Sequence, residues 1–441
     1  MQMAKNPITL NGLLSLLRSA IETFPDNRTG GNKSYGLEEI ALSAFSVFFM
    51  QNPSFLAHQK AMKTAKGKSN AETIFGIKEI PCDNQIRNVL DPVSPEHLFP
   101  VFEQAYECMS ENDLIDSLRT LKNHLLITFD GTRYFSSKEI GCIHCSTTLH
   151  KDESVTYYHS MLTPVIVSPG NNMALSLPPE FISPQDGKDK QDCETNAAKR
   201  WLDVYGERYG KLGATILGDD LFSRQPVCEK ILSKGLNFIL VCKPDSHKTL
   251  YEWLRVLEEA GDMRSVVIRR WNGKFREIYT YKYANDAPLR DTEDALPINW
   301  VELTITKEDG KIIYKNAFAT KHTISNKNVE AIVDAGRARW KVENEHNNTL
   351  KTKGYNLEHN FGHGQDHLSS LLATLNLLAF LFHTILDLVD GSYALLRKTL
   401  PSRKTFFDDL RALTRYLCFE SWDQLLEFMI KGLELGDPAS G

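Results

Sequence analysis

Residues 326–364 read NKNVEAIVDAGRARWKVENEHNNTLKTKGYNLEHNFGHG and decide how the rest of the chain is interpreted. Side chains in this stretch recur at the spacing of one face of an α-helix. The stripe comprises Val329, Ile332, Gly336, Trp340, Glu343 and Leu350. Because an unpaired charge is costly to bury, a glutamate on this stripe indicates either a buried ion pair or a functional carboxylate.

Arg339 lies four residues before Glu343 and can reach the same patch of the helix. One interpretation is an ion pair that only fixes the helix, and the other is a carboxylate that the protein uses. Glu345 lies roughly 200° further round the helix, on its polar face, so the two glutamates are not interchangeable. Gly354 ends the helix as a C-cap glycine.

Two segments that alternate with the period of a β-strand also end in carboxylates. In HLLITFDGTRYF, residues 124–135, Asp130 stands at the end of a strand, and a turn-forming Asp-Gly pair is the alternative reading. In GATILGDDLFS, residues 213–223, another strand ends in Asp219 and Asp220, which point to opposite sides.

The remaining pattern predicts alternating strands and helices. Strands are expected within residues 157–169 and 237–244, and helices at 191–209 and 225–234, an order that suits a mixed sheet flanked by helices. The 343 − 219 = 124 residues between Asp219 and Glu343 are more than one helix and one strand require. Four strand-like segments between residues 251 and 319 predict a small β-rich insertion there.

The run RWKVE, residues 339–343, resembles the third-acid signature of the DDE transposases of bacterial insertion sequences. In the group with a β-rich insertion, that signature is Tyr, two residues, Arg, three residues, Glu, six residues, Lys. Arg339 and Glu343 match it. Gly336 stands at the tyrosine position and Leu350 at the lysine position, with Lys351 one residue late.

The resemblance covers most of the chain from about residue 80 to residue 388, and GDDLF matches the second-acid motif with Asp219 and Phe222. It implies an α/β fold with an RNase H-like mixed sheet flanked by helices. Asp130 would lie on the first strand, Asp219 on the fourth and Glu343 on the late helix.

By the same resemblance, these three acids hold two Mg²⁺ ions, for which Mn²⁺ can substitute. The enzyme would cut DNA at transposon ends and join the freed 3′-hydroxyl to target DNA. Its partners would be double-stranded DNA, as terminal inverted repeats and target, and a second copy of the chain. The alternatives are an RNase H-like nuclease without strand transfer and a catalytically silent DNA-binding derivative.

Several residues outside the three acids are candidates for DNA contact. Arg339 and Lys351 would contact phosphates or form ordinary ion pairs. Trp271 and Trp300 in the insertion would take a flipped base or simply form its core. The lysines of segment 58–68 would contact DNA or form a solvated face.

Together these features divide the chain into five parts. They are a helical N-terminal DNA-binding domain (1–120), the first part of the catalytic core (121–250), the β-rich insertion (251–320), the rest of the core with the Glu343 helix (321–390) and a helical C-terminal tail (391–441).

A second metal is suggested by CIHC, residues 142–145. Cys142 and Cys145 form a CxxC turn, and His150 and His159 follow at irregular spacing but within reach of a structural zinc ion; packed or exposed thiols in a hairpin are the alternative. The histidines of the loop around residues 359–367 are expected to support the acids or contact DNA rather than bind metal.

The chain of 441 residues, with 42% hydrophobic and 24% charged residues, is typical of a globular protein of two to four units. Its net charge of -5 excludes a uniformly basic nucleic-acid binder but not local basic patches. Eight irregularly spaced cysteines without a secretory signal favour a cytoplasmic location. The apolar run 368–388 is interrupted by polar residues, which favours a buried core helix over a membrane span.

Overall fold

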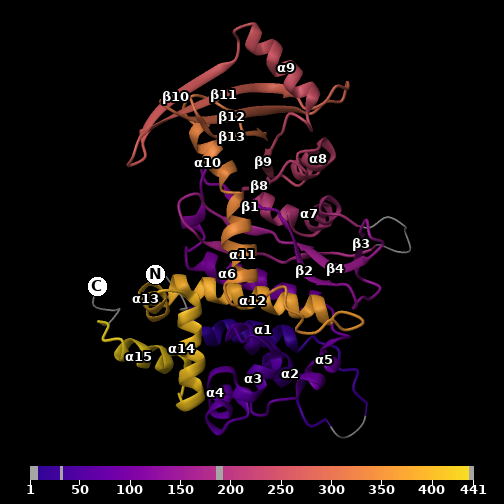
Figure 1. Cartoon of the computed structure of the whole chain (residues 1–441), viewed down its shortest axis with the longest axis vertical. Coiled ribbons are helices and arrows are strands. Elements are labelled where there is room, and N and C mark those ends of the chain that lie inside the picture. Colours follow the sequence, from indigo (N-terminus) through magenta and orange to yellow (C-terminus); the bar gives the residue numbers. More distant parts are fainter. Residues whose placement is uncertain (1–7, 30–32, 185–191, 437–441) are drawn as a thin grey trace.

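A computed structural model describes residues 8–29, 33–184 and 192–436. A mixed sheet runs through the molecule, with a helical layer at one end and a strand-rich extension at the other (Figure 1). The helices that follow the extension, α10 and α11, run from it towards the helical layer (Figure 1). The chain is therefore a mixed α/β protein, as the alternating pattern predicts.

Five strands form the centre of the nine-stranded sheet, in the order β6-β5-β1-β8-β9. β8 is parallel to both β1 and β9, whereas β5 pairs antiparallel with β1 and with β6. Their side chains are almost all buried, as in strands covered on both faces. The bounds are β1 Leu125–Thr128, β5 Val165–Val167, β6 Ala174–Ser176, β8 Ala214–Gly218 and β9 Asn237–Val241.

The insertion contains its four predicted strands, but they do not form a separate small sheet. β13 pairs antiparallel with β9, so the insertion extends the central sheet in the order β9-β13-β12-β11-β10. Helix α9 packs on β11. The bounds are α9 Lys248–Glu259, β10 Arg264–Trp271, β11 Arg276–Pro288, β12 Pro297–Lys307 and β13 Ile312–Thr320.

The segment that holds the strand predicted to end at Asp130, residues 124–135, is divided between two sheets. β1 ends at Thr128, and the chain then enters β2, which pairs with β4 in a second, four-stranded sheet. Asp130 lies at this crossing, just before the first residue of β2. The bounds are β2 Gly131–Ser137, β3 Ser146–Leu149, β4 Val155–Leu162 and β7 Glu180–Ile182.

The helix predicted to carry Glu343 is not regular. It consists of α10 (Val329–Arg337), a π-helical turn (Val342–Asn347) and α11 (Asn348–Thr352). A π turn contains an extra residue, so the side chains that follow it are rotated relative to an α-helical stripe. Glu343, within this turn, is exposed, while Val342, His346 and Leu350 are buried; Trp340, after the end of α10 and before the π turn, is also exposed. The predicted stripe is correct up to Gly336 and wrong at Trp340 and Glu343.

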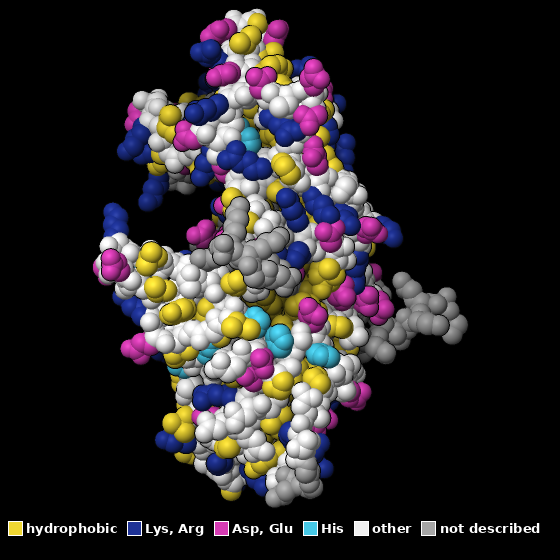
Figure 2. All heavy atoms as spheres, turned by 90° about the vertical axis from the view of Figure 1, so that its right-hand side faces the viewer, with side chains coloured by type: hydrophobic (Ala, Val, Ile, Leu, Met, Phe, Trp, Pro, Cys, Tyr) yellow, Lys and Arg dark blue, Asp and Glu magenta, His cyan; other side chains and the backbone are white. Residues whose placement is uncertain are grey.

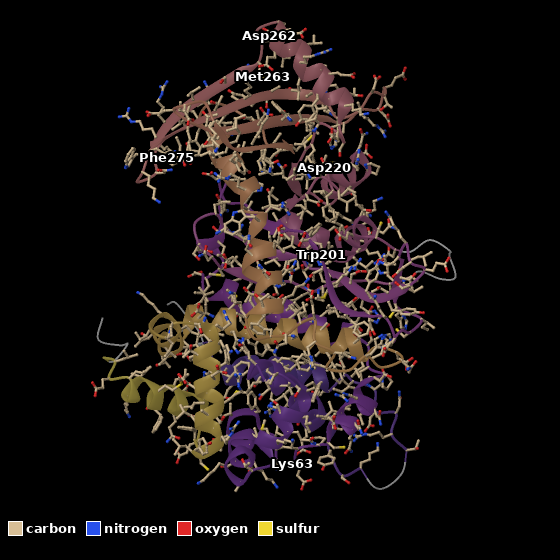
Figure 3. The ribbon with its side chains drawn as sticks, viewed as in Figure 1. Lys63, Trp201, Asp220, Asp262, Met263 and Phe275 are labelled. Atoms are coloured by element: carbon tan, nitrogen blue, oxygen red, sulfur yellow. The ribbon has the colours of Figure 1, made fainter. Side chains whose placement is uncertain are left out.

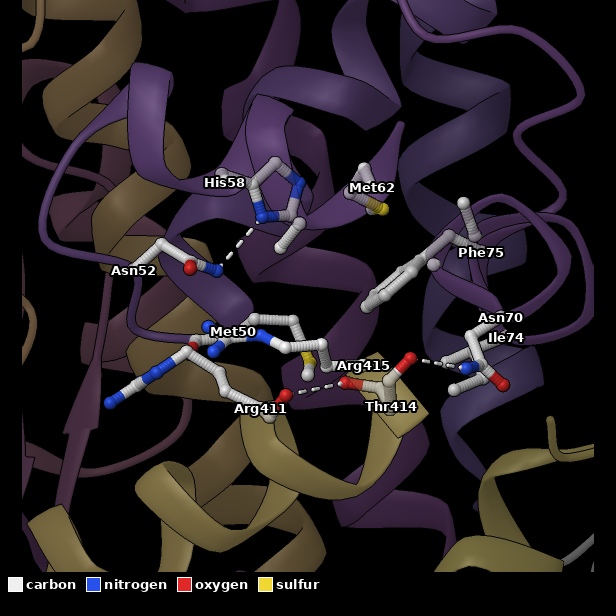
Figure 4. A pocket seen from close by; sticks show the side chains of 13 residues that line it. Met50, Asn52, His58, Met62, Asn70, Ile74, Phe75, Arg411, Thr414 and Arg415 are labelled. Carbon is white, nitrogen blue, oxygen red and sulfur yellow. Dashed lines mark hydrogen bonds between the residues drawn. The ribbon is translucent and has the colours of Figure 1, made fainter. Parts of the chain in front are cut away.

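The helical layer combines the two ends of the chain, which the sequence analysis treats as separate parts. α12 packs against α2, and α14 against α4. Arg411 of α14 donates to the carbonyls of Met50 and Gln51, and Asn70 of α4 donates to the carbonyl of Thr414 (Figure 4). The pocket in Figure 4 lies at this junction.

The bounds of the remaining helices complete the fold. They are α1 Leu10–Ile21, α2 Leu37–Phe49, α3 Phe55–Met62, α4 Ala65–Phe75, α5 Asp83–Leu90, α6 Phe99–Glu111, α7 Glu194–Lys211, α8 Gln225–Ser233, α12 Leu368–Val389, α13 Gly391–Thr399, α14 Arg403–Tyr416 and α15 Trp422–Gly432, with short 3-10 turns at Pro95–Leu98 and Asp116–Leu118.

By length and composition α12 would be able to cross a membrane, but 78% of its most apolar window is buried inside the protein. Its neighbours include α1, α2, α5, α6, α13 and β6. The expectation of a buried core helix is confirmed.

Gly336 lets α10 approach the sheet closely. A Cβ atom at this position would lie 2.9 Å from both Ile239 of β9 and Phe318 of β13. Both neighbours are buried in the core, so they have little freedom to move aside.

We expect Gly336→Ala to lower the free energy of unfolding by about 1 to 3 kcal/mol, because the added methyl group overpacks the core. Gly432→Ala is the matched control, since nothing lies near its Cβ position at the end of α15. It should change stability by less than about 1 kcal/mol, in the stabilising direction. Urea unfolding of both variants measures the difference, and equal effects would contradict the close approach.

Candidate functional site

Asp130 is held in place by the π turn. The Asn347 side-chain amide donates to Asp130 Oδ2 at 2.9 Å. The side-chain oxygen Oδ1 of Asn347 lies 2.9 Å from His346 Nδ1. On the other side of the ring, His346 Nε2 lies 2.7 Å from Ser176 Oγ. Burial lowers the pKa of His346 to about 4, so the ring is neutral and its Nδ1–H donates to Asn347 while Nε2 accepts from Ser176. This chain of hydrogen bonds fixes the orientation of Asp130.

Asp219 and Asp220 follow β8 and have different roles. Asp220 accepts hydrogen bonds from the backbone N–H of Lys243, at 2.7 Å, and from the Ser246 hydroxyl, which anchors the loop after β9. Asp219 accepts the backbone N–H of Leu221 at 2.9 Å, and its charge acts on Asp130. The two acids thus separate as the strand period predicts, with Asp220 structural.

The carboxylates around Asp130 raise its pKa. Burial is the largest cause, and the charges of Glu343 and Asp219 add to it, so that the pKa is about 6 despite the opposing effects of Arg339 and Asn347. Glu343 and Asp219 are thus near enough for their charges to act on Asp130. Glu343 itself is exposed on the π turn.

A fourth carboxylate, Glu194 in the first turn of α7, was missed by the sequence analysis. Burial and the charges of Asp130 and Asp219 raise its pKa to about 7. A Cβ at Gly131 would lie 2.1 Å from the Glu194 carboxylate, so glycine at 131 permits the approach. From the sequence alone, an acid in the first turn of a helix is explained by its favourable interaction with the helix dipole. The sequence therefore did not indicate that Glu194 lies near Asp130.

Arg339 and Lys351 differ in their surroundings. The charge of Arg339 lowers the pKa of Asp130, and, in the described part of the chain, Arg339 forms no ion pair with Glu343. The structural ion pair considered for these two residues is therefore absent there. Lys351 instead pairs with Glu358 at 2.9 Å, which favours a structural role.

The two tryptophans proposed for base stacking lie in different environments. Trp271, at the end of β10, is 65% exposed, whereas Trp300 is 3% exposed and packs edge-on against Tyr251 with ring centroids 5.8 Å apart. Phe275 marks the tip of the same hairpin, beyond Trp271 (Figure 3). Trp300 thus belongs to the core, and only Trp271 is accessible to a base.

The lysines of segment 58–68 are exposed, as either interpretation of that segment requires. Figure 3 shows Lys63 at the far end of the helical layer, well away from Asp220 in the core. DNA that contacted both places would have to extend along most of the molecule.

The cysteine and histidine cluster differs from the predicted one. Cys142, Cys145 and His159 come together, but the fourth member is His363, from the loop before α12. His150 is exposed and hydrogen-bonds to Thr156 at 2.7 Å, so its inclusion was wrong. His363 comes from the loop that was expected to support the acids or contact DNA, and it lies in this cluster. Spacing along the sequence gave no signal for this contact, because the two segments are remote.

This cluster is compact, whereas the carboxylates are spread out. Within the described residues, it is the one group of potential metal ligands whose atoms all lie within 4.8 Å of one another. The acids around Asp130 are more widely spaced. They nevertheless form an all-oxygen, negatively charged set, which suits a hard divalent cation.

The contrast between the tryptophans is testable. If Trp271 takes a base as the resemblance implies, Trp271→Ala should weaken DNA binding at unchanged stability, because an exposed stacking surface is lost. Trp300→Ala should lower the free energy of unfolding by about 3 to 5 kcal/mol through a core cavity. Fluorescence-anisotropy binding and urea unfolding measure the two effects, and tight DNA binding by Trp271→Ala would remove it from the interface.

The raised pKa of Asp130 predicts a pH-dependent stability. The folded protein holds the Asp130 proton up to about pH 6, whereas the unfolded chain loses it near pH 4, so stability falls as pH rises through this window. Without divalent cations, Asp130→Asn should therefore be more stable than wild type at pH 8, by about 1 to 3 kcal/mol, and no more stable at pH 4.

Asp152 provides the control for this measurement. Hydrogen bonds from Ser154 lower its pKa, so Asp152→Asn should bring no gain at pH 8. Thermal unfolding at both pH values measures the difference. Equal stability of Asp130→Asn and wild type at pH 8 would contradict the raised pKa of Asp130.

Comparison with known proteins leaves the chain without an assigned relative. No protein-family model matches it, and no curated protein matches it significantly. Its function therefore has to follow from the chemistry of its own residues.

Proposed function

We propose that the protein is a DDE transposase that cuts DNA at transposon ends and transfers the freed 3′-hydroxyl into target DNA with magnesium. The observation that carries the proposal is Asp130, whose pKa burial raises to about 6 and on which the charges of Glu343 and Asp219 also act. Perturbed carboxylates cluster where a protein binds cations or catalyses reactions.

The order of strands supports the same proposal. An RNase H-like core is expected to have three antiparallel strands followed by two parallel ones. The central sheet has this arrangement, with β6, β5 and β1 antiparallel and β8 and β9 parallel to β1. Asp130 follows the first of these strands along the chain and Asp219 the fourth. Glu343 follows the insertion on the late helical segment, where the resemblance places the third acid.

Asp130, Asp219 and Glu343, with Glu194 beside them, would hold the magnesium. Asn347 occupies only Oδ2 of Asp130, so Oδ1 is available to a second partner. Bound magnesium would activate water or a 3′-hydroxyl and stabilise the departing oxygen. The raised pKa values of Asp130 and Glu194 make cation binding compete with protons, so binding should strengthen as pH rises towards 7.

Other residues would position the DNA. The positive charge of Arg339 acts on Asp130 from the same patch and would contact a phosphate entering the site. Trp271 is exposed on the far edge strand of the extended sheet, where a displaced base would stack. The edge position leaves room for a duplex along the insertion.

The test is Mg²⁺-dependent cleavage of a duplex carrying the repeats that flank the gene. Asp130→Ala, Asp219→Ala and Glu343→Gln should each lower cleavage by more than about a thousandfold while keeping DNA binding, because each removes a metal ligand. Glu345→Gln, two residues away on the same π turn, is the matched control and should cleave normally. Glu194→Gln tests whether the fourth carboxylate contributes.

Each outcome has a distinct meaning. Full cleavage by Glu343→Gln would remove that residue from the catalytic set. Cleavage by wild type that never yields joined products from pre-cut ends would indicate a nuclease. Specific binding of the repeats without any cleavage would indicate a DNA-binding derivative.

A further inference from the structure

Four potential metal ligands from three distant segments meet on one side of the four-stranded sheet. Cys142 and Cys145 lie in the turn between β2 and β3, His159 lies on β4, and His363 lies in the loop before α12. Figure 2 shows histidine side chains gathered around the middle of one face of the molecule. None of these four residues takes part in the proposed phosphodiester chemistry.

The distances within the cluster are those of a tetrahedral site. The two sulfurs are 3.8 Å apart, the two Nε2 atoms are 3.2 Å apart, and three sulfur-to-nitrogen distances are 3.4, 3.4 and 3.6 Å. With Zn–S bonds of about 2.3 Å and Zn–N bonds of about 2.0 to 2.1 Å, the edges of a tetrahedron are about 3.8, 3.3 and 3.6 Å. Each measured separation lies within about 0.2 Å of its ideal value.

The protons are arranged for metal binding. Nδ1 of His363 lies 2.9 Å from the carbonyl oxygen of Gly364, which can only accept, so Nδ1 carries the proton and Nε2 turns a lone pair into the cluster. The backbone N–H of Cys142 donates to Cys145 Sγ at 3.4 Å, which favours a sulfur that carries negative charge. The cluster thus presents lone pairs inward.

The surroundings leave these ligands few other partners. Cys145, His159 and His363 are 6%, 5% and 9% exposed. The ring of His159 stacks on Tyr134 with centroids 5.6 Å apart, and the ring of His363 lies 4.5 Å from that of Phe135. Polar atoms buried among aromatic rings are costly unless something satisfies them, and a cation would satisfy all four. A disulfide would need the sulfurs about 2.05 Å apart, well short of their separation here.

We propose that Cys142, Cys145, His159 and His363 bind one structural Zn²⁺ ion that ties the β2–β4 ribbon to the loop before α12. Two thiolates and two imidazoles in tetrahedral geometry select zinc over the hard, oxygen-seeking magnesium. All four positions are filled by the protein, which is typical of a structural rather than a catalytic site.

The ion would lock a loop that is also held from the N-terminal helices. Arg87 of α5 donates to the carbonyl of Phe361 at 2.9 Å, and Asp91 accepts the backbone N–H groups of Gln365 and Leu368 at 2.9 and 3.1 Å. The zinc therefore joins the ribbon that begins at Asp130 to the N-terminal helices through one loop. Its removal should loosen the contact between the helical layer and the catalytic core.

The first measurement is the metal content of the full-length protein, purified under reducing conditions and reconstituted with zinc, then dialysed. Elemental mass spectrometry should find about one zinc per chain, since a closed structural site is nearly fully occupied. His363→Ala and Cys145→Ser should retain less than about a tenth of that. His150→Ala is the matched control, because it removes the exposed histidine of the same ribbon, and it should retain the full amount.

Cobalt substitution of the wild-type protein makes the test independent of how the variants fold. Co²⁺ in a tetrahedral site with two thiolates should give intense visible absorption and a sulfur charge-transfer band, both bleached by added Zn²⁺. A chelator should lower the unfolding temperature of wild type and of His150→Ala but leave that of His363→Ala unchanged.

Three results would overturn the proposal. They are wild-type protein without zinc after reconstitution, His363→Ala with undiminished zinc, and thiol titration showing Cys142 and Cys145 joined as a disulfide in the native chain. None of these readouts depends on DNA cleavage, so the zinc site and the proposed transposase activity stand or fall separately.

Discussion

The burial of Asp130, where β1 leaves the central sheet, is the constraint on which the surrounding structure depends. Asp130 sits where β1 leaves one sheet for the other, and its neighbours Asp219, Glu343 and Glu194 come from three other elements. Such a gathering costs stability unless fixed polar groups or a cation offset it. The protein offsets this cost in three ways. The Asn347 amide donates to Asp130, the positive charge of Arg339 acts on it, and the missing side chain at Gly131 leaves room for Glu194.

The π turn reconciles two demands on the same helical segment. Its extra residue lets Asn347 and His346 point inward to hold Asp130, while Glu343 remains outside the core where its charge is solvated. A regular α-helix with the same sequence would place Glu343 on the buried stripe, where an unpaired charge is costly. Irregular helical turns of this kind are frequently found at functional sites.

Much of the architecture was predictable because it depends on local periodicity. The strands of the insertion, helices α7 and α8 and the buried helix α12 follow from alternation, helical spacing and glycine turns. The π turn was not predictable, since an extra residue in a helix has no signature in the apolar pattern. Tertiary contacts between remote segments decide two other features. They place His363 rather than His150 in the cysteine and histidine cluster, and they bury Trp300 but leave Trp271 exposed. Glu194 escaped notice for the same reason.

Because the insertion continues the central sheet, the sheet fixes the distance between the acids and the exposed edge strand of the insertion. From β8, which carries Asp219, to the edge strand β10, which carries Trp271, the order β8-β9-β13-β12-β11-β10 contains five steps between neighbouring strands. At about 4.8 Å per step this spans about 24 Å, which equals the rise of about seven base pairs of duplex DNA at about 3.4 Å each. Because hydrogen bonds join every step, the DNA cleavage proposed above would fall at a fixed number of base pairs from a duplex bound at the edge strand.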